Sequence, residues 1–179
     1  QSSEGLISPA EFIPLSEELR LIIKMTQQLL ERALADLKKW HNSGHQLYLS
    51  VNLSTQHLEQ PSLAEHTRSL LQKYDLPACC LRFEVTESAL MRDHRSAIDT
   101  MLALSELGIQ LALDDFGTGY SSLKYLKELP IDGIKIDRSF VQDIGIDSSD
   151  ETIIEAMLSM ANSLGMYCVA EGVETEQQL

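Results

Sequence analysis

The chain has 179 residues, 44% of them hydrophobic, which is enough for one domain with a core of its own. Its 27 acidic and 14 basic residues leave a formal net charge of -13. This charge argues against binding to DNA or RNA polymers, because such binding depends on neutralising phosphates. A small anionic ligand stays compatible with it if metal ions in the binding site reverse the local charge.

The sequence shows no secretion signal, and no apolar run approaches the ~18 residues of a membrane span. The cysteines, Cys79, Cys80 and Cys168, lack zinc-site spacing, and their odd number argues against a disulfide framework. We interpret them as buried or half-buried thiols in a reducing compartment. We therefore expect a cytoplasmic domain, whose parent protein can still be anchored in a membrane elsewhere.

The predicted elements alternate between helices and strands, which is typical of α/β architecture. A long amphipathic helix is predicted over residues 15–42, and Ser43-Gly44 ends it. Strand-like runs follow at residues 46–51, 81–85, 109–113, 133–136 and 166–170. Helices are expected between them at residues 63–74, 96–107, 122–129 and 151–164. We therefore expect one domain over residues 1–179.

The strand-like runs are mostly continuous apolar stretches, as expected for parallel strands that are buried on both faces. An open doubly wound sheet and a closed β/α barrel both produce this alternation of elements. No strand-like run is followed by a GxGxxG or GxxxxGK phosphate loop, which weakens the case for a nucleotide-binding open sheet.

Polar side chains are predicted at the carboxyl end of each strand-like run. In chain order they are Asn52, Glu84, the pair Asp114-Asp115, Lys135 and Glu171, with Glu87 and Glu174 close behind two of them. In a parallel barrel all carboxyl ends open onto one mouth, where such folds place their chemistry. The sequence therefore predicts one polar cavity that these side chains share.

Each of these side chains also has a purely structural explanation. A single carboxylate after a strand is more often the N-cap of the next helix than a ligand. Lys135 inside an apolar strand is harder to explain, because burying an unpaired ammonium is costly. Adjacent Asp114 and Asp115 repel each other unless a cation joins them. Together, these positions favour a functional site over a series of unrelated helix caps.

The donor types indicate the chemistry of the site. Carboxylate and amide oxygens suit hard cations such as Mg²⁺ or Mn²⁺. The five histidines, at positions 41, 45, 57, 66 and 94, show no metal-site spacing, and we interpret all of them as surface residues. The sequence contains no Ser-His-Asp or Cys-His order with a nucleophile elbow, which makes covalent acyl chemistry a poor fit. Two metal ions that activate a water against a phosphate ester fit this donor set.

Eight ordered motifs resemble those of one known family. They are GLISP (5–9), FIPL (12–15), VNLS (51–54), EVTES (84–88), DDFGTGYSSL (114–123), LPID (129–132), IKIDRSFV (134–141) and AEGVET (170–175). From end to end, the chain resembles the EAL-domain cyclic di-GMP phosphodiesterases. One departure is Leu19-Arg20-Leu21, where many relatives have a glycine before Leu-Ile, and we expect it to affect only the start of the helix.

The resemblance implies a TIM-like (β/α)8 barrel with one antiparallel strand, which hydrolyses cyclic di-GMP to linear pGpG. It implies that the family's Glu-Ala-Leu triplet lies before Gln1 and that the last strand lies beyond Leu179, so we expect an EAL phosphodiesterase domain that is incomplete at both ends. The implied partners are cyclic di-GMP, a second copy of the chain in a homodimer, and cyclase or sensor domains in the parent protein.

The resemblance also implies roles for single residues. Asn52, Glu84 and Asp114 would bind one metal ion, and Asp114 would bridge to a second ion held by Asp115. Glu171 would be a further carboxylate of the catalytic metal site. Lys135 would orient the attacking water, and its alternative role as the base that deprotonates this water stays open. Glu87 would tether the loop after Asp115, and loop or substrate contacts are implied for Phe116, Gly117, Thr118, Gly119, Tyr120, Ser121, Ser122 and Glu174.

Mg²⁺ or Mn²⁺ would support turnover at this two-metal site, and Ca²⁺ would inhibit it because it accepts a looser, higher coordination. Two other functions stay open on the sequence alone. An inactive domain of this kind would act as a sensor that binds cyclic di-GMP. The barrel would otherwise serve only for dimerisation in a larger signalling protein.

Overall fold

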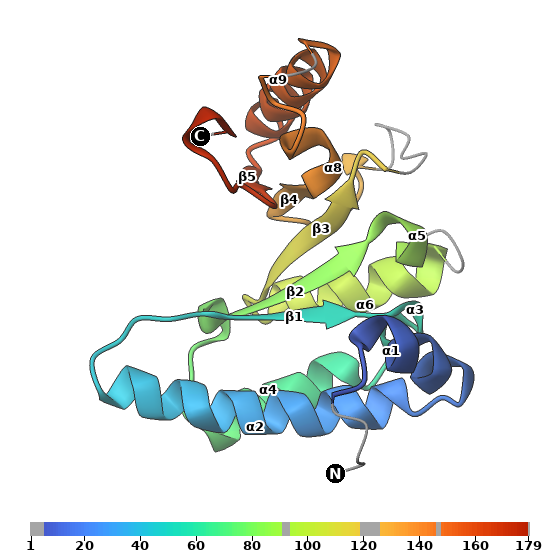
Figure 1. Cartoon of the computed structure of the whole chain (residues 1–179). Helices are drawn as coiled ribbons and strands as arrows, with labels where there is room; N and C mark the ends of the chain where they lie inside the picture. The colour runs from blue at the N-terminus through green and yellow to red at the C-terminus, as the bar shows by residue number, and fades with distance from the viewer. Residues whose placement is uncertain (1–5, 91–93, 119–125, 146–147, 179) are drawn as a thin grey trace.

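Five parallel strands form a single curved sheet (Figure 1) in the computed structural model, which describes residues 6–90, 94–118, 126–145 and 148–178. The strands are β1 (Leu49–Leu53), β2 (Leu81–Thr86), β3 (Gln110–Phe116), β4 (Gly133–Ile136) and β5 (Tyr167–Ala170). The α-helices are α1 (Pro9–Glu18), α2 (Ile22–Asn42), α3 (Thr55–Leu58), α4 (Leu63–Lys73), α5 (Glu87–Leu90), α6 (His94–Glu106), α8 (Arg138–Val141) and α9 (Ser148–Ser163). Two short 3-10 turns are η1 (Ala78–Cys80) and η2 (Glu176–Gln178).

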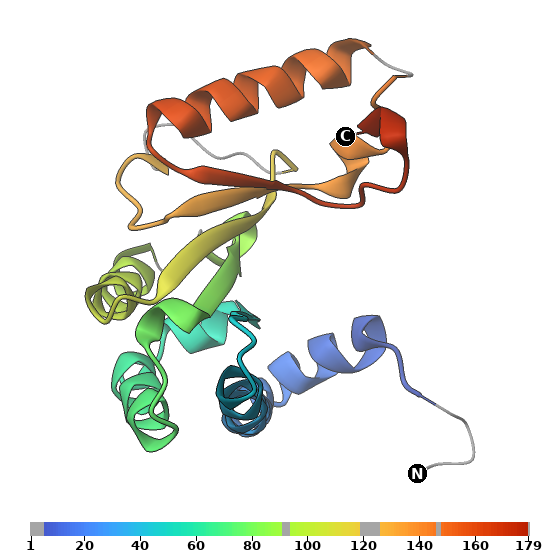
Figure 2. The same cartoon turned by 90° about the vertical axis from the view of Figure 1, so that its left-hand side faces the viewer.

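The order of the strands decides between the two architectures that the sequence left open. A doubly wound sheet reverses its order at a switch point, whereas here each strand pairs with the next one along the chain. Right-handed crossovers between successive strands then all pass over the same face of the sheet. Accordingly, α4, α6 and α9 lie on the convex side (Figure 2). This arrangement is that of a TIM-like β/α barrel.

All four pairings between the described strands are parallel. The antiparallel strand that the family resemblance implies is therefore not one of these five strands, and that expectation stays a prediction.

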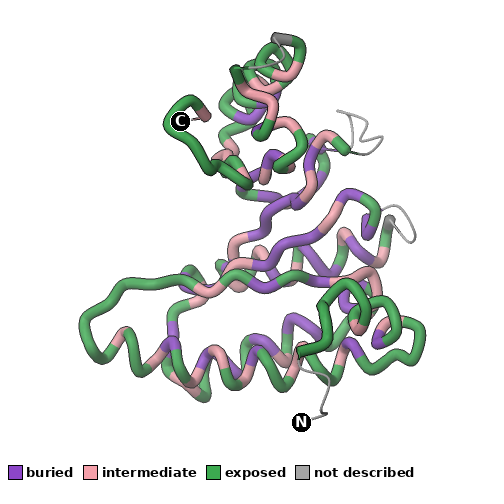
Figure 3. Tube along the Cα trace, viewed as in Figure 1, coloured by how far each residue is buried: buried purple, intermediate pink, exposed green. Residues whose placement is uncertain are grey.

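The convex face of the sheet carries the hydrophobic core. The strand residues without measurable exposure include Leu81, Phe83, Leu111, Leu113 and Ile134, and they belong to one buried cluster with residues of the surrounding helices. Burying each such side chain stabilises the fold by about 1.5–3 kcal/mol. In Figure 3 the buried segments follow the strands and the inner sides of the helices.

The concave face is polar, which corrects the expectation of strands that are apolar on both faces. Because side chains alternate along a strand, every second residue of β2 lies on this face, including Arg82 and Glu84. The strands that appear as apolar runs in the sequence thus have two different faces. One side packs on helices, and the other lines the interior of the barrel.

The long helix predicted over residues 15–42 is two helices, α1 and α2. Arg20 interrupts it with a left-handed backbone, φ 56°, and the Leu21 N–H donates to Ser16 O as in a Schellman ending. The family resemblance implies a glycine here in many relatives, and glycine adopts this conformation without steric cost. The departure from the family pattern therefore falls at a helix junction and not within a helix.

The remaining elements agree with the sequence predictions, with shifted boundaries. β1 begins at Leu49 instead of residue 46, and β3 extends to Phe116 instead of residue 113. Because β1 also ends at Leu53 instead of residue 51, Asn52 and the Asp114-Asp115 pair lie inside their strands and not after them, whereas Glu84 lies inside β2 as predicted. The helix predicted over residues 122–129 lies mostly outside the described residues.

Two expectations about single side chains are wrong. His57 is only 2% exposed instead of lying on the surface, because its Nδ1 accepts a hydrogen bond from the Ser54 N–H at 3.0 Å and completes the cap of α3. Cys79 is exposed, whereas Cys80 is buried and Cys168 is half-buried. Adjacent residues of the η1 turn point in different directions, which explains the difference between the two neighbouring thiols.

Candidate active site

The parallel register places the predicted polar residues side by side on the concave face. Asn52 of β1 is the register partner of Glu84 of β2, and Thr86 of β2 is the partner of Asp114 of β3. Glu84 and Asp114 are only 8% and 9% exposed. Residues from separate stretches of sequence thus meet near the carboxyl ends of neighbouring strands, as expected for a β/α barrel.

A bulge in β3 lets two consecutive aspartates serve the same face. Leu113 pairs with Ile134 and Phe116 pairs with Ile136, so Asp114 and Asp115 together lie opposite Lys135. Asp115 adopts a left-handed backbone, φ 54°, where a regular strand would turn its side chain to the other face. The extra residue re-aims the Asp115 carboxylate toward that of Asp114.

Lys135 of β4 lies at the centre of the carboxylates. Its Nζ donates to Glu84 Oε2 at 2.7 Å, and it forms ion pairs with Asp114 Oδ1 at 2.8 Å and Glu171 Oε1 at 2.6 Å. The Lys135 side chain is 13% exposed. Burial lowers the pKa of Lys135, but the contacts to Asp114, Glu171 and Glu84 outweigh this effect and raise the pKa overall. The ammonium is therefore charged at neutral pH.

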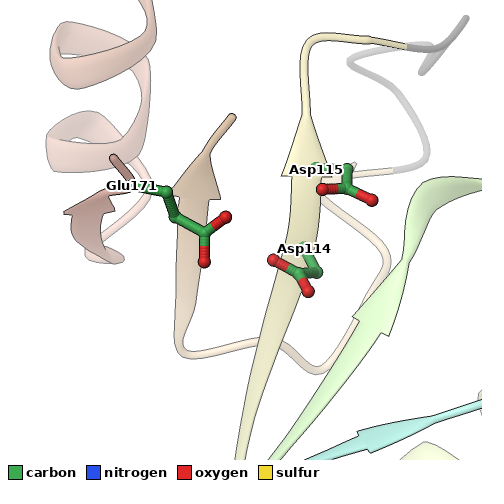
Figure 4. A group of neighbouring side chains, drawn as sticks. All are labelled: Asp114, Asp115 and Glu171. Atoms are coloured by element: carbon green, nitrogen blue, oxygen red, sulfur yellow. The ribbon is translucent and has the colours of Figure 1, made fainter. Parts of the chain in front are cut away.

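Three carboxylates form a group that could hold a metal ion. Oxygen atoms of Asp114, Asp115 and Glu171 all lie within 4.8 Å of one another, and Figure 4 shows them converging from β3 and from the end of β5. Burial raises the pKa of Asp115, and the neighbouring charges of Asp114, Asp137 and Glu171 raise it further, against the opposing effect of Lys135. A cation would relieve this repulsion, and oxygen-only donors suit Mg²⁺ or Mn²⁺.

Ser50 is a site residue that the sequence analysis missed. Its hydroxyl donates a short hydrogen bond to Glu84 Oε1, so both oxygens of this carboxylate are engaged, one by Ser50 and one by Lys135. The signal was available in the sequence, because Ser50 precedes Asn52 by two positions and shares its face of β1. A lone serine in an apolar run carried too little information to be singled out.

Three other predicted residues lie around this cluster in different ways. Asn52 is exposed beside Glu84, and among the described residues its side chain makes no hydrogen bond. Glu87 begins α5 and is 5% exposed, yet neither of its carboxylate oxygens has a hydrogen-bond partner in the described part of the chain. Glu174 is exposed, and only its backbone N–H is bonded, to Gln178 Oε1 at 2.8 Å.

The segment after Asp115 begins with a tight turn. The Thr118 hydroxyl donates to Asp115 O at 2.9 Å, and Phe116 lies in the hydrophobic core and does not face the carboxylates. Gly117 has φ 99°, and a Cβ there would lie 2.4 Å from Met157 Cε and 2.9 Å from Phe140 Cε2. Gly119, Tyr120, Ser121 and Ser122 lie outside the described residues, so their predicted roles stay predictions.

A pocket of about 470 Å³ opens at the carboxyl ends of β1 and β2. Its lining is Pro14, Glu17, Glu18, Ser54, Thr55, Gln56, Thr86, Ser88 and Ala89. Thr86 belongs to the same strand and face as Glu84 and is the register partner of Asp114. The pocket therefore reaches the strand position next to Asp114, although none of the clustered carboxylates lines it, and Gln56 joins two parts of its wall by donating to Glu17 O at 2.6 Å.

The EAL domain family profile matches residues 1–179, the whole chain. The chain belongs to the EAL domain family. It is 44% identical over 178 residues to a Pseudomonas aeruginosa protein named cyclic di-GMP phosphodiesterase NbdA, covering 99% of this chain and 23% of that protein. It is 40% identical over 175 residues to the bifunctional diguanylate cyclase/cyclic di-GMP phosphodiesterase MucR of the same species, covering 97% and 26%.

Solved EAL structures support the same assignment. The PaMucR phosphodiesterase in complex with c-di-GMP superimposes with a TM-score of 0.92 at 39% identity, covering 99% of this chain and 73% of that one. The EAL domain of Xanthomonas citri FimX in complex with c-diGMP gives a TM-score of 0.90 at 25% identity, covering 99% and 70%. The EAL fold predicted from the motifs is therefore confirmed. This chain spans about a quarter of the two curated relatives.

Among the helices of the described residues, none combines the length and the apolar character that a membrane crossing requires.

Proposed function

We propose that this EAL domain hydrolyses cyclic di-GMP to linear pGpG in bacterial second-messenger signalling. One observation carries the proposal: acidic side chains from β2, β3 and the end of β5 converge on Lys135 at one mouth of the barrel. The relatives named cyclic di-GMP phosphodiesterases support the choice of substrate, as does the structure of PaMucR in complex with c-di-GMP.

The carboxylates fit a two-metal site with Mg²⁺ or Mn²⁺. Asp114, Asp115 and Glu171 form its most compact part, and Asn52 with Glu84 would complete it from the neighbouring strands. When bound, such ions lower the pKa of a coordinated water and offset the negative charge of a phosphodiester. The like-charge repulsion at Asp115 supports this reading of the cluster, since it is unfavourable without a cation.

Lys135 would orient the attacking water by donating a hydrogen bond. Its contacts with Glu84, Asp114 and Glu171 support this role, because they keep the ammonium among the carboxylates where a metal-bound water would lie. Glu84 would in turn fix the Lys135 ammonium, while Ser50 fixes Glu84. Lys135 would thereby be held by its neighbours before substrate arrives.

The pocket beside the cluster would receive part of the dinucleotide. Its volume of about 470 Å³ lies within the range of small-molecule sites, about 300–1,000 Å³. Hydroxyl and amide side chains on its walls, such as Ser54, Thr55 and Gln56, offer hydrogen bonds to base edges or ribose. Glu87, buried and unpartnered among the described residues, would tether the loop that follows Asp115.

The larger context of the domain also belongs to the proposal. MucR is named as both a diguanylate cyclase and a cyclic di-GMP phosphodiesterase. This supports an attached cyclase or sensor domain in the parent protein. We further propose a homodimer, a cytoplasmic location for the domain, and a parent protein that can be membrane-anchored.

The test is to assay the whole protein with cyclic di-GMP and Mn²⁺ or Mg²⁺ and to follow pGpG by chromatography. Asp114→Ala and Lys135→Ala should each reduce turnover at least about a hundredfold, because each removes several kcal/mol of stabilisation of the transition state. Asp99→Ala, an exposed aspartate on α6, is the matched control and should retain activity. Full activity of Asp114→Ala would refute the proposal.

Binding without turnover would instead identify the domain as a cyclic di-GMP sensor, and neither binding nor turnover would leave dimerisation as its role. Ca²⁺ should inhibit, because it accepts a looser, higher coordination than Mg²⁺. Normal turnover with Ca²⁺ as the only divalent cation would contradict the two-metal account.

A further inference from the structure

The concave face of the sheet holds a second polar group, beneath the carboxylates, that the proposed function does not use. The Arg82 guanidinium lies between the rings of Tyr48 and Tyr167, 4.4 Å from each ring centroid. We call these three side chains the Arg82 stack. Arg82 precedes Glu84 by two positions in β2, so the stack lies one side-chain layer below the carboxylates on the same face.

The stack connects the two ends of the described sheet. Tyr48 directly precedes β1, and Tyr167 is the first residue of β5. These are the first and last strands in the order of the sheet, and no backbone ladder joins them to each other. Arg82, on β2, therefore provides a side-chain link that crosses the concave face from one end strand to the other.

The sheet leaves room for this link. Gly133 of β4 is the register partner of Tyr167, and a Cβ on Gly133 would lie 2.3–2.5 Å from three atoms of the Tyr167 ring. The next residue in the same row is Ala112 of β3, whose side chain is a single methyl group. The small residues at these two positions, Ala112 and Gly133, leave space for the Tyr167 ring to extend over β4 and β3 toward Arg82.

The guanidinium has several neighbours in this arrangement. It lies 4.4 Å from both ring centroids, and its Nη2 donates to Gln110 Oε1 at 3.1 Å, whereas its buried Nε–H has no hydrogen-bond partner among the described residues. A cation near two aromatic rings is attracted by both of them. Arginine is suited to this contact because its planar guanidinium can stack on a ring. The contacts to the two rings and to Gln110 therefore suit a role in holding the sheet.

β5 connects the Arg82 stack to the clustered carboxylates. Tyr167, Val169 and Glu171 alternate onto the concave face, and Glu171 follows the last residue of the strand directly. Glu171 reaches Lys135 Nζ at 2.6 Å and stays within 4.8 Å of the aspartate oxygens only if β5 curls toward β3. The position of the Tyr167 ring and the reach of Glu171 are thus set by the same curvature.

We propose that Arg82 and Tyr167 are positioning residues of the metal site: the Arg82 stack holds β5 in the curvature that keeps Glu171 beside Asp114 and Asp115. The catalytic consequence rests on the proposed function. The effect on β5 and on metal affinity does not depend on the substrate.

The test compares Arg82→Lys and Tyr167→Leu in the whole protein. Arg82→Lys keeps the charge but removes the planar group, and Tyr167→Leu removes the ring. Both should weaken Mn²⁺ binding, measured by calorimetry without substrate, by about tenfold, as for other groups that orient metal ligands. Both should also increase amide hydrogen exchange in β5, measured without metal. If the domain is active, the turnover number should fall while the substrate KM stays nearly unchanged.

Two matched controls distinguish a specific effect on the metal site from a general loss of stability. Tyr167→Phe keeps the ring and removes only a hydroxyl that is buried and unbonded within the described residues, so Mn²⁺ affinity should stay near that of the wild type. Tyr74→Leu removes a comparable contact under Lys73 on α4, 5.2 Å from the ring centroid, and should leave Mn²⁺ affinity unchanged.

Wild-type Mn²⁺ affinity and wild-type β5 exchange in both folded test variants would overturn the inference. Unfolding of both variants would also overturn it, because the stack would then support the fold as a whole. A wild-type protein that binds Mn²⁺ but leaves cyclic di-GMP intact would refute the proposed function and leave the positioning role standing.

Discussion

At the scale of single residues, Lys135 shows how one side chain can hold the site together in the absence of metal. Its ammonium neutralises part of the charge of Glu84, Asp114 and Glu171 at distances between 2.6 and 2.8 Å. Each of these side chains is mostly shielded from water, the most exposed being Glu171 at 33%. Screening by solvent is therefore weaker here than for a surface ion pair.

Removal of this ammonium should destabilise the metal-free protein. We expect Lys135→Met to lower the free energy of unfolding by about 3 kcal/mol in urea with a chelator present, since it leaves buried carboxylates uncompensated. Lys38→Met is the matched control, because Lys38 pairs with Asp75, whose side chain is 95% exposed, and should cost less than about 1 kcal/mol. Equal effects of the two substitutions would show that the carboxylates are not coupled through Lys135.

His57 should make stability depend on pH. Burial is the largest effect on the pKa of His57 and lowers it. The unfolded chain, with an ordinary histidine pKa of about 6.5, thus takes up a proton at higher pH than the folded one. Neutral His57 therefore contributes fully to the free energy of unfolding above the pKa of the unfolded chain. This contribution is lost as the pH falls toward the lower pKa of the folded protein.

The measurement is urea unfolding between pH 7.5 and 5. His57→Gln should flatten the decline in the free energy of unfolding with falling pH, whereas His45→Gln, at an exposed position, should keep the wild-type slope. A wild-type slope in His57→Gln would mean that other groups cause the decline.

At the scale of elements, the end of β3 decides how the site is built. The bulge at Asp114-Asp115 turns two neighbouring carboxylates to one face, and Gly117 then lets the chain pass close to α8 and α9. A regular strand would have directed one of the two aspartates into the hydrophobic core. The irregularity therefore has a function, as bulges beside active sites commonly do.

Gly117→Ala should lower the free energy of unfolding more than the same substitution at another glycine with positive φ. Both Gly117 and Gly44 have positive φ, 99° and 88°, but a Cβ meets Met157 and Phe140 only at Gly117, and nothing within 4 Å at Gly44. We expect Gly44→Ala to cost about 1 kcal/mol of backbone strain and Gly117→Ala to exceed it by about 1–3 kcal/mol. Thermal unfolding of both variants measures the difference, and equal costs would rule out close packing at Gly117.

At the scale of the whole molecule, the acidic charge of -13 and the metal site belong together. A strongly acidic protein attracts divalent cations and repels free anions, so an anionic substrate depends on bound cations at the mouth. Folding brings the carboxylates together against their mutual repulsion. Metal binding should therefore be linked to stability.

Mn²⁺ should raise the free energy of unfolding by about 2.7 kcal/mol at a free concentration one hundred times its dissociation constant. Asp115→Asn should bind Mn²⁺ more weakly and lose most of this gain, because it removes one of the three clustered carboxylates. Denaturant titrations at several Mn²⁺ concentrations measure the effect. A wild-type unfolding midpoint that does not respond to Mn²⁺ would contradict a metal site in the folded state.

The sequence by itself determined the class of fold, the main helices and strands, and the family. It did so because periodicity, strand ends and ordered motifs are local properties. Gly133–Ile136 agrees with its predicted strand residue for residue, and the predicted carboxylates of Glu84, Asp114 and Glu171 do meet at Lys135.

The tertiary structure alone decided which face each side chain occupies and what it contacts. No local pattern distinguishes the buried His57 from an exposed histidine, or reveals the extra residue that turns Asp115 toward Asp114. The link from Tyr48 through Arg82 to Tyr167 joins positions far apart in the chain. Such contacts depend on the register and curvature of the assembled sheet, which arise only when separate strands pair.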